Sequence, residues 1–270
     1  MDEVRVASMD GIELAAAVHR PAADAGSRGT VLLVHGISSD LDEGGGFVRL
    51  ADRLAAHGLT AVRFSFRGHG TSGGTPQGVT IAGEMLDLQA VSAYAAKEFP
   101  GPLAVVAASF GAVATGLSMP WLGKRLAGLV LWNPVLDLRR TFLEPELPWG
   151  VANFGPAAMA RLAEDGCLVL NGVFPLGRVL FAEMPGYRPI EAYTAHSPPA
   201  LVLHGDRDGH VSFDIARRAA ETIRHWEFHP LSGATHGFHG PEHEAAAVAV
   251  TTRWLRDAIT LADTLIRLDQ

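Results

Sequence analysis

The fold of this chain is decided by the stretch Val105-Val106-Ala107-Ala108-Ser109-Phe110-Gly111-Ala112. An apolar run typical of a buried strand breaks there at a serine between small residues and continues into a helix-like segment. A serine at such a turn is held in a strained backbone conformation, which lifts its hydroxyl out of the end of the sheet. Small neighbours are needed because the strand and the helix nearly touch. Ser109 is therefore the first candidate nucleophile, although Ala107 replaces the first glycine of the pattern G-x-S-x-G.

Two later segments carry the groups that a serine nucleophile needs. Residues 200–208 have the pattern of a buried strand that runs into a loop with two carboxylates, Asp206 and Asp208. Residues 231–238 have the pattern of a short strand whose following loop presents His236. Serine at its ordinary pKa is a poor nucleophile, so it needs an imidazole to take its proton and a carboxylate to orient that imidazole. The chain presents serine, acid and histidine in that order, each at a strand end.

A third apolar run begins at Gly29 and ends at His35-Gly36, and Ile37 follows it. In this arrangement, the residue after the run supplies one backbone N–H to an oxyanion hole, and the residue after the serine supplies the other. The expected donors are therefore the amides of Ile37 and Phe110. His35 is expected to shape this loop rather than to transfer protons.

Together with Phe66-Arg67-Gly68-His69-Gly70-Thr71-Ser72, these motifs make the chain resemble the α/β-hydrolase superfamily over nearly its whole length. Within that superfamily it is most similar to the feruloyl/cinnamoyl esterase group and its thioesterase-like and acyl-hydrolase relatives. The shared features are the His35-Gly36 loop, the loop of residues 67–70, a long helix beginning near Thr80 and the spacing His204-Gly205-x-x-Asp208.

The resemblance implies a serine hydrolase that cleaves a carboxylic ester of a small or medium, apolar or aromatic acyl group through an acyl-enzyme on Ser109. The family spacing selects Asp208 as the acid and leaves Asp206 as a loop or capping residue. Arg67 and His69 match positions that brace the loop beneath the serine.

Three other functions compete with an esterase. A thioesterase or acyltransferase acting on carrier-bound or CoA acyl groups uses the same three side chains. A non-catalytic ligand-binding protein of this fold is also an alternative, because fold does not dictate chemistry, but such a protein has no need for Asp208 and His236. A serine peptidase is disfavoured because such relatives usually carry an additional large domain.

Strand and helix patterns alternate along most of the chain, which predicts an α/β protein of the α/β-hydrolase fold. The expected sheet has about eight mostly parallel strands with helices on both faces. The first two strands form a hairpin around Asp10-Gly11. The expected strands are Val4–Ser8, Glu13–Arg20 and the segments near 30–35, 60–66, 103–108, 126–133, 200–204 and 225–231.

Two segments have clear helical patterns. Apolar residues with one-face spacing predict a helix that Gly58 ends, and its buried positions are Phe47, Leu50, Ala51, Leu54 and Ala55. The segment 242–266 is expected to be a helix that covers the sheet rather than a dimer interface. Its expected apolar stripe consists of Ala247, Val250, Trp254, Ala258, Leu261 and Leu265.

The alternation fails between Asn133 and Ser197, where prolines interrupt an apolar segment. We predict that residues 134–197 are a cap inserted after the sixth strand, and that 1–133 and 198–270 form the hydrolase core. Large apolar side chains of the cap either roof an acyl or aromatic pocket or only pack the cap onto the sheet. They are Phe142, Leu143, Trp149, Phe154, Leu168, Phe174, Leu180 and Phe181.

Other candidate residues receive structural interpretations. The spacing His236-x-x-His239-x-x-x-His243 resembles a metal motif, but it lacks the carboxylate and the open geometry of catalytic zinc, so no metal is expected. His210 is expected to be a solvated loop residue. Cys167 is expected to be a small buried apolar residue.

Composition narrows the class of protein. The 270 residues, 48% of them hydrophobic, are enough for one catalytic domain with a sizeable core. A net charge of −7 without any lysine or arginine run argues against nucleic acid or an anionic membrane as partner. We expect a small-molecule ester or thioester substrate, no cofactor, and a monomer or homodimer.

The N-terminus lacks the apolar core of a signal peptide, and no stretch reaches the roughly 18 apolar residues of a membrane span, so the expected location is cytoplasmic. The single cysteine excludes an intrachain disulfide and fits a reducing compartment.

Overall fold

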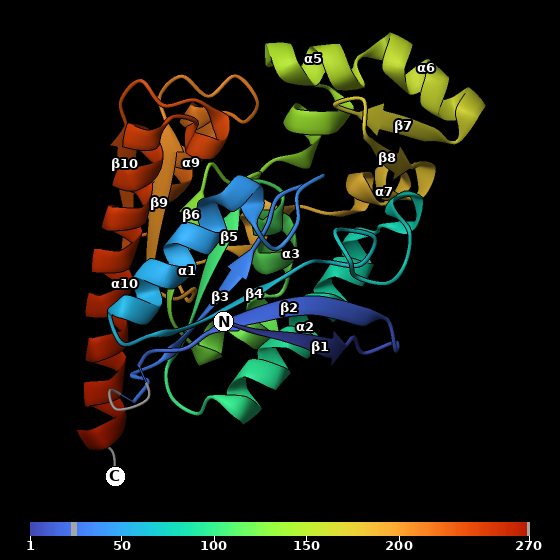
Figure 1. Ribbon diagram of the computed structural model, residues 1–270. Coiled ribbons are helices and arrows are strands. Elements are labelled where there is room, and N and C mark those ends of the chain that lie inside the picture. Colours follow the sequence, from blue (N-terminus) through green and yellow to red (C-terminus); the bar gives the residue numbers. More distant parts are fainter. Residues whose placement is uncertain (23–25, 269–270) are drawn as a thin grey trace.

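The computed structural model describes residues 1–22 and 26–268. Its centre is an eight-stranded sheet with the strand order β1-β2-β4-β3-β5-β6-β9-β10 (Figure 1). β2 pairs antiparallel with β1 and with β4, and all other neighbours pair in parallel. The expected α/β-hydrolase fold is confirmed.

All eight expected strands belong to this sheet, with ends that differ from the expectation by at most two residues. Their bounds are β1 Asp2–Ala7, β2 Glu13–His19, β3 Thr30–Val34, β4 Thr60–Phe64, β5 Leu103–Ala108, β6 Leu126–Trp132, β9 Ala200–Gly205 and β10 Trp226–Leu231. The central parallel strands are buried on both faces, which explains why they are continuous apolar runs rather than alternating ones.

Helices cover both faces of the sheet. α1 (Gly46–Ala56) and α10 (Pro241–Leu268) pack on one face, around one apolar cluster. α2 (Ile81–Glu98), α3 (Gly111–Leu117) and α9 (Phe213–Thr222) bury their apolar residues in the cluster on the other face. Shorter helical elements are η1 Glu43–Gly45, η2 Pro76–Gly78, α4 Met119–Leu122, η3 Gly123–Arg125 and η6 His236–Phe238.

The helix ends follow from local sequence. The Thr80 hydroxyl accepts a hydrogen bond from the amide of Gly83 and caps α2. Gly58 terminates α1, as expected: two residues after Ala56 its φ of +80° turns the chain and allows the Leu59 amide to return to the Leu54 carbonyl at 3.1 Å.

The buried face of α10 differs from the expected stripe. Ala247, Val250, Trp254 and Ala258 of the expected stripe pack toward the sheet, but Leu261 and Leu265 are exposed. The most buried residues of α10 also include residues outside that stripe: Val248, Thr251, Thr252, Leu255 and Ile259. Two threonines belong to this face because their hydroxyls are satisfied internally: Thr251 accepts from the Trp132 indole at 2.9 Å, and Thr252 donates to the Val248 carbonyl. A polarity pattern alone assigns such residues to the solvent side. No helix in the described ranges has both the length and the apolar composition for crossing a bilayer.

The chain between β6 and β9 forms further elements at the carboxyl end of the strands (Figure 1). Several of its prolines begin helices, where the missing N–H has no cost, rather than simply interrupting structure. The sequence patterns did not reveal the two-stranded sheet of β7 and β8. The elements are η4 Arg139–Leu143 (a π-helix), α5 Pro148–Phe154, α6 Pro156–Asp165, β7 Cys167–Leu170, β8 Phe174–Gly177, α7 Arg178–Glu183, η5 Met184–Gly186 and α8 Pro189–Ala192.

The end of β9 generates a stability prediction. A Cβ at Gly205 would lie 2.3 Å from the Ala234 carbonyl oxygen, which is backbone, whereas one at Gly209 meets nothing within 4 Å. We expect Gly205→Ala to lower the free energy of unfolding by about 1–3 kcal/mol through overpacking, and Gly209→Ala to change it by less than about 0.5 kcal/mol. Denaturant unfolding of both variants checks this, and equal stabilities would show that the two loops can separate at no cost.

Candidate active site

Ser109 occupies the turn between β5 and α3 in a left-handed conformation, with a φ of +49°. Its amide donates to the Trp132 carbonyl at 2.8 Å, and its carbonyl accepts from the Val135 amide at 3.0 Å, so both backbone groups of the strained residue are held. A Cβ at Gly111 would lie 2.5 Å from the His35 carbonyl oxygen, which explains the glycine there. Ala107 is fully buried in the core cluster, where its methyl group finds space.

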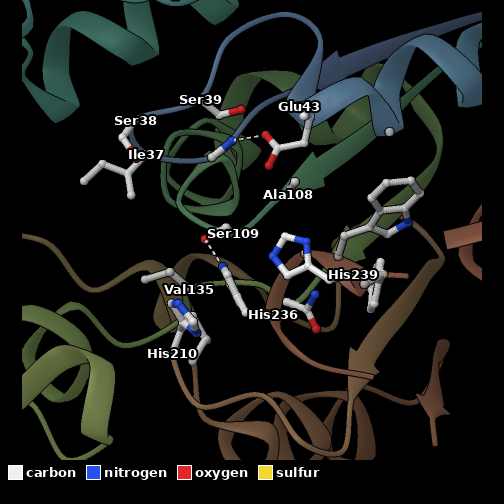
Figure 2. Close-up of a pocket in the computed structure, with 18 of the residues that line it drawn as sticks. Ile37, Ser38, Ser39, Glu43, Ala108, Ser109, Val135, His210, His236 and His239 are labelled. Atoms are coloured by element: carbon white, nitrogen blue, oxygen red, sulfur yellow. Dashed lines mark hydrogen bonds between the residues drawn. The ribbon is translucent and has the colours of Figure 1, made fainter. Parts of the chain in front are cut away.

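Ser109, His236 and Asp208 form a hydrogen-bonded chain. The Ser109 hydroxyl lies 3.0 Å from His236 Nε2, and His236 Nδ1 lies 2.8 Å from Asp208 Oδ2 (Figure 2). An ionised carboxylate only accepts hydrogen bonds, so Nδ1 carries the proton and Nε2 has a free lone pair toward the serine. The side chain of His236 is 19% exposed and that of Asp208 is fully buried. This is the geometry of a serine activated by a general base.

Four donors surround the buried carboxylate of Asp208. The amides of His210 and Val211 donate to Oδ1 at 2.8 and 3.0 Å, while His204 Nε2 lies 3.2 Å from Oδ2, beside His236. Burial alone would raise the pKa of Asp208, but the hydrogen bonds from His204 and His236 outweigh it and hold this pKa well below its usual range. Asp208 therefore remains an anion that can stabilise a protonated His236.

Asp206 lies apart from this chain. Its Oδ1 accepts from the Gly233 amide at 2.7 Å and ties the loop after β9 to the loop after β10. The two carboxylates thus have different partners, and only Asp208 contacts His236.

The amides of Ile37 and Phe110 are free to bind a substrate oxygen. Neither donates a hydrogen bond to any acceptor in residues 1–22 and 26–268. The loop that carries Ile37 passes directly over the serine, because a Cβ at Gly36 would lie only 3.0 Å from the Ser109 Cβ. Two unpaired amides beside a serine have the arrangement of an oxyanion hole.

His35 braces the same loop from below. It is 1% exposed, its Nδ1 donates to the Gly36 carbonyl at 2.8 Å, and its Nε2 accepts from the Phe66 amide at 2.9 Å. Burial, aided by the neighbouring His69, lowers the pKa of His35 to about 3. The imidazole of His35 is therefore neutral near neutral pH and supports the loop at Gly36.

Arg67 anchors the neighbouring loop. Its guanidinium binds two carboxylates, each at 2.7 Å: the buried one of Asp87 and the exposed one of Asp10. His69 donates through Nδ1 to the Arg67 carbonyl at 2.8 Å and stacks on Phe174 of β8. Neither Arg67 nor His69 lines the cavity above Ser109.

Ser109 opens into a cavity of about 510 Å³. Figure 2 shows Ile37 and Val135 on one side of Ser109, and Glu43 and His239 on the other. The remaining apolar lining comes mainly from Phe142, Trp149, Val211 and Phe238. Within the described chain, every non-glycine residue with a positive φ lines this cavity: Ser38, Glu43, Ser109, Asn133, Asn171 and Phe238.

The large apolar residues of the segment 134–197 divide between the two expected roles. Phe142 and Trp149 line the cavity, whereas Phe174 borders a second cavity of about 540 Å³ that shares Ser38, Ser39 and Gly44 with the first. The others pack within one apolar cluster that also contains Phe110 of the serine turn; they are Leu143, Phe154, Leu168, Leu180 and Phe181. Cys167 is half-buried at the start of β7.

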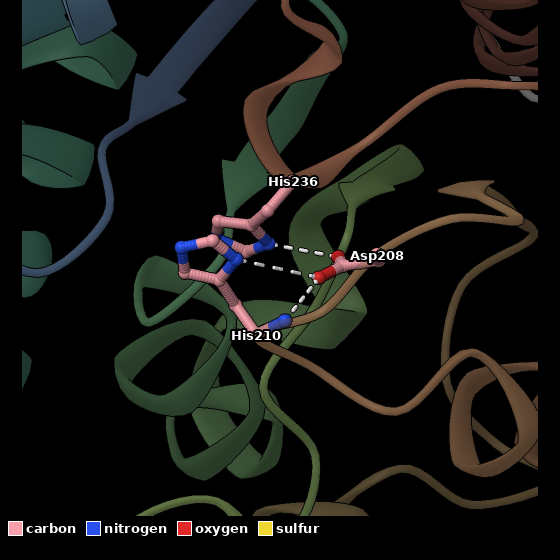
Figure 3. A group of neighbouring side chains, drawn as sticks. All are labelled: Asp208, His210 and His236. Atoms are coloured by element: carbon pink, nitrogen blue, oxygen red, sulfur yellow. Dashed lines mark hydrogen bonds and ion pairs between the residues drawn. The ribbon is translucent and has the colours of Figure 1, made fainter. Parts of the chain in front are cut away.

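His210 is a loop residue, as expected, and its side chain is 36% exposed, but its ring is also part of the site. The ring stacks on His236 at 4.7 Å between centroids (Figure 3), and Trp149 packs against it at the same centroid distance. Asp208, His210 and His236 together place three potential metal ligands within 4.8 Å. The two imidazole rings are nearly parallel, at 17°, so their in-plane lone pairs do not converge on one ion. His239 and His243 do not complete this group.

Sequence reasoning missed three residues that shape the site. Glu43 accepts from the Gly36 amide at 2.7 Å, and Asn133 accepts from the Gly205 amide at 2.9 Å. His204 is buried against Asp208. Asn133 directly follows β6, and His204 is the next-to-last residue of β9. Their places at the ends of correctly predicted strands could have indicated the site, whereas no sequence pattern near Glu43 did.

A serine, a histidine and an aspartate joined at the carboxyl edge of this sheet place the protein in the class of α/β-hydrolases, which makes it a hydrolytic enzyme. Residues 25–165, just over half of the chain, match the family described as serine aminopeptidase, S33, and the chain belongs to that family. No curated protein sequence matches it.

Solved structures share the fold over nearly the whole chain. Est1E from Butyrivibrio proteoclasticus with bound ferulic acid is 19% identical, with a TM-score of 0.81, and the match covers 95% of this chain and 100% of that one. A putative hydrolase from Agrobacterium vitis S4 is 24% identical, with a TM-score of 0.75 and coverage of 96% and 98%. A malate-bound thermophilic esterase from Thermogutta terrifontis is 21% identical, with a TM-score of 0.68 and coverage of 96% and 99%.

The contrast between the two loop carboxylates can be measured. We expect Asp208→Asn to lower kcat by about 10⁴-fold, because an amide beside Nδ1 favours the wrong imidazole tautomer. Asp206→Asn keeps an acceptor for Gly233 and should retain most activity. Steady-state hydrolysis of an activated ester by both variants checks the assignment, which equal losses would contradict.

His35 generates a prediction about stability and pH. Its pKa is about 3 in the folded protein and about 6.5 in an unfolded chain, so between these values the unfolded chain holds one more proton. Stability therefore falls as the pH drops below about 6.5, by about 1.4 kcal/mol per pH unit from this residue. We expect urea unfolding between pH 4 and 6 to show a shallower pH dependence in His35→Gln, by one proton. Identical slopes would mean that His35 is protonated in the fold.

Proposed function

We propose that this protein is a carboxylic ester hydrolase that forms an acyl-enzyme on Ser109. The observation that carries the proposal is the hydrogen-bonded chain from Ser109 through His236 to Asp208 beside a cavity that is lined in part by large apolar side chains. Ile37 and Phe110 provide two free amides for the oxyanion. Residues 134–197 act as a cap over the acyl site.

Each chemical step uses groups that are in place. His236 Nε2 takes the hydroxyl proton as Ser109 Oγ attacks the ester carbonyl carbon, and the carbonyl oxygen becomes an anion held by the amides of Ile37 and Phe110. Collapse of this intermediate breaks the ester bond, and the leaving alkoxide takes the proton from His236. Water then repeats the sequence on the acyl-enzyme, releases the acid and restores the Ser109 hydroxyl.

The cavity favours an apolar or aromatic acyl group. Phe142 packs edge-on against Phe110 at 5.5 Å between ring centroids, which places an aromatic face beside the serine turn. Trp149 and Val211 extend this surface. Such surfaces bind planar rings and alkyl chains. The structurally similar Est1E holds ferulic acid, which supports testing an aromatic acyl ester.

The charge of the cavities favours an ester over a CoA thioester. Among the described residues that line the two adjoining cavities there is no lysine or arginine, and the carboxylates of Asp40, Asp42, Glu43 and Glu244 lie along them. The phosphates of CoA need cationic partners, most often arginine. An uncharged leaving alcohol needs none.

We expect the protein to release p-nitrophenol from acetate and butyrate esters and to cleave methyl ferulate, faster than it cleaves butyryl-CoA. Ser109→Ala should lower kcat by about 10⁴-fold or more, because the oxyanion hole and binding alone leave only a small residual rate. The rates are measured photometrically, with an aminoacyl p-nitroanilide included for the peptidase alternative.

A faster rate on butyryl-CoA or on the anilide would replace the esterase with a thioesterase or a peptidase that uses the same serine. No turnover of any substrate, together with no labelling of Ser109 by a fluorophosphonate, would contradict catalysis and favour a binding protein. A Ser109→Ala variant as active as the wild type would place the chemistry elsewhere.

A further inference from the structure

We propose that Glu43 is the positioning residue of the oxyanion turn, which we define as Gly36–Ser39. Its carboxylate binds the first residue of this turn and faces the last, so that the Ile37 amide between them points to the oxygen that becomes negative. The inference rests on the proposed hydrolase function and adds a residue that contacts neither Ser109 nor His236 by a hydrogen bond.

The oxyanion turn has little support of its own. One weak hydrogen bond closes it, from the Ser39 amide to the Gly36 carbonyl at 3.3 Å. Ser38 has a φ of +58°, a conformation that costs a non-glycine residue about 1–2 kcal/mol. A turn with such strain and one long hydrogen bond needs outside contacts to keep the Ile37 amide in one orientation.

Glu43 supplies those contacts on the cavity side. Its Oε2 accepts from the Gly36 amide at 2.7 Å, and Figure 2 shows the Ser39 hydroxyl pointing toward the same carboxylate, whose pKa it lowers. One carboxylate thus binds the first residue of the turn and faces the last. His35 donates to the Gly36 carbonyl, so the two peptide groups that flank Gly36 are each held by a hydrogen bond, and the second of them carries the Ile37 amide.

The backbone around Glu43 is built to place this side chain. Glu43, Gly44 and Gly45 have successive positive φ values of 46°, 62° and 90°, immediately before α1 begins at Gly46. The two glycines adopt this conformation at no steric cost, but Glu43 is strained in it. A strained non-glycine residue beside a cavity, held by a short hydrogen bond, indicates a function for that side chain.

A second role for Glu43 has to be separated from positioning. Its carboxylate interacts electrostatically with His236, so its charge could act on the imidazolium instead of on the turn. Burial raises the pKa of Glu43, and a neutral carboxyl still accepts a hydrogen bond from Gly36 through its carbonyl oxygen. A positioning role therefore requires a side chain long enough to reach the turn and an oxygen that accepts a hydrogen bond. An electrostatic role requires a negatively charged carboxylate.

Two conservative variants distinguish these roles. Glu43→Gln keeps the length and the acceptor but loses the charge, and Glu43→Asp keeps the charge but is one methylene too short to reach both ends of the turn. Asp52→Asn removes a carboxylate from an exposed position on α1 and is the control. For each, kcat and KM on p-nitrophenyl butyrate are measured, together with inhibition by butylboronic acid, whose serine adduct places an oxygen in the oxyanion hole.

We expect Glu43→Asp to lower kcat by about 10–100-fold, somewhat less than the loss of a whole oxyanion donor, with KM changed less than threefold. Its affinity for the boronic acid should fall by a similar factor. Glu43→Gln should stay within about threefold of the wild type in both measurements, and Asp52→Asn should not differ from it. Thermal unfolding confirms that each variant is folded.

A loss in Glu43→Gln with an unchanged Glu43→Asp would overturn the proposal in favour of charge. Equal losses in the two variants would also overturn it, because an uncharged acceptor of full length would then not be sufficient. If Glu43→Asp does not fold, Ser39→Ala removes the hydroxyl that faces the Glu43 carboxylate and should weaken boronic acid binding without raising KM. A wild-type protein with no Ser109-dependent turnover would overturn the proposed function and this inference together. If the wild type is active and the Glu43 variants have unchanged kcat and boronic acid affinity, only this inference is overturned.

Discussion

The left-handed backbone of Ser109 is the constraint on which the rest of the site depends. A serine in this conformation can exist only where strand, turn and helix pack closely, and glycines at positions 36 and 111 allow the loop after β3 to cross within van der Waals distance. The same crossing brings the Ile37 amide beside the serine. One steric requirement therefore places the nucleophile and an oxyanion donor together.

Backbone strain is concentrated around the cavity, and the stability of the buried sheet compensates for it. In the part of the chain that the structure describes, six non-glycine residues with positive φ, each costing about 1–3 kcal/mol, line one cavity. The strands below them are fully buried, and each Val, Leu or Phe side chain removed from water contributes about 1.5–3 kcal/mol. The rigid core allows the turns at its carboxyl edge to hold geometries that an isolated loop would leave.

The surroundings of Asp208 and Glu43 shift the pKa values of these two carboxylates in opposite directions. Asp208 is surrounded by donors, which lower its pKa and keep it charged beside His236. Glu43 is partly buried and has fewer donors, so the loss of solvation raises its pKa, and it lies next to the turn where negative charge develops during the reaction. An anion is useful behind the histidine, whereas a strong anion near the oxyanion hole would oppose the reaction. His210 stacks on His236, and Trp149 packs against His210 at a tilt, so the segment 134–197 contacts the site through Trp149.

The sequence by itself determined the eight strands, the serine turn and the order of serine, acid and histidine. These features are local: a buried parallel strand is an uninterrupted apolar run, and a nucleophile turn needs small residues at fixed spacing. The choice of Asp208 over Asp206 came from family spacing, and the structure shows its basis in the partner of each carboxylate. Only the tertiary structure decided the roles of Glu43, His204 and His210, and which face of α10 is buried. Each depends on contacts between residues far apart in the chain, or on hydroxyls satisfied inside the fold, and neither leaves a periodic signal in the sequence.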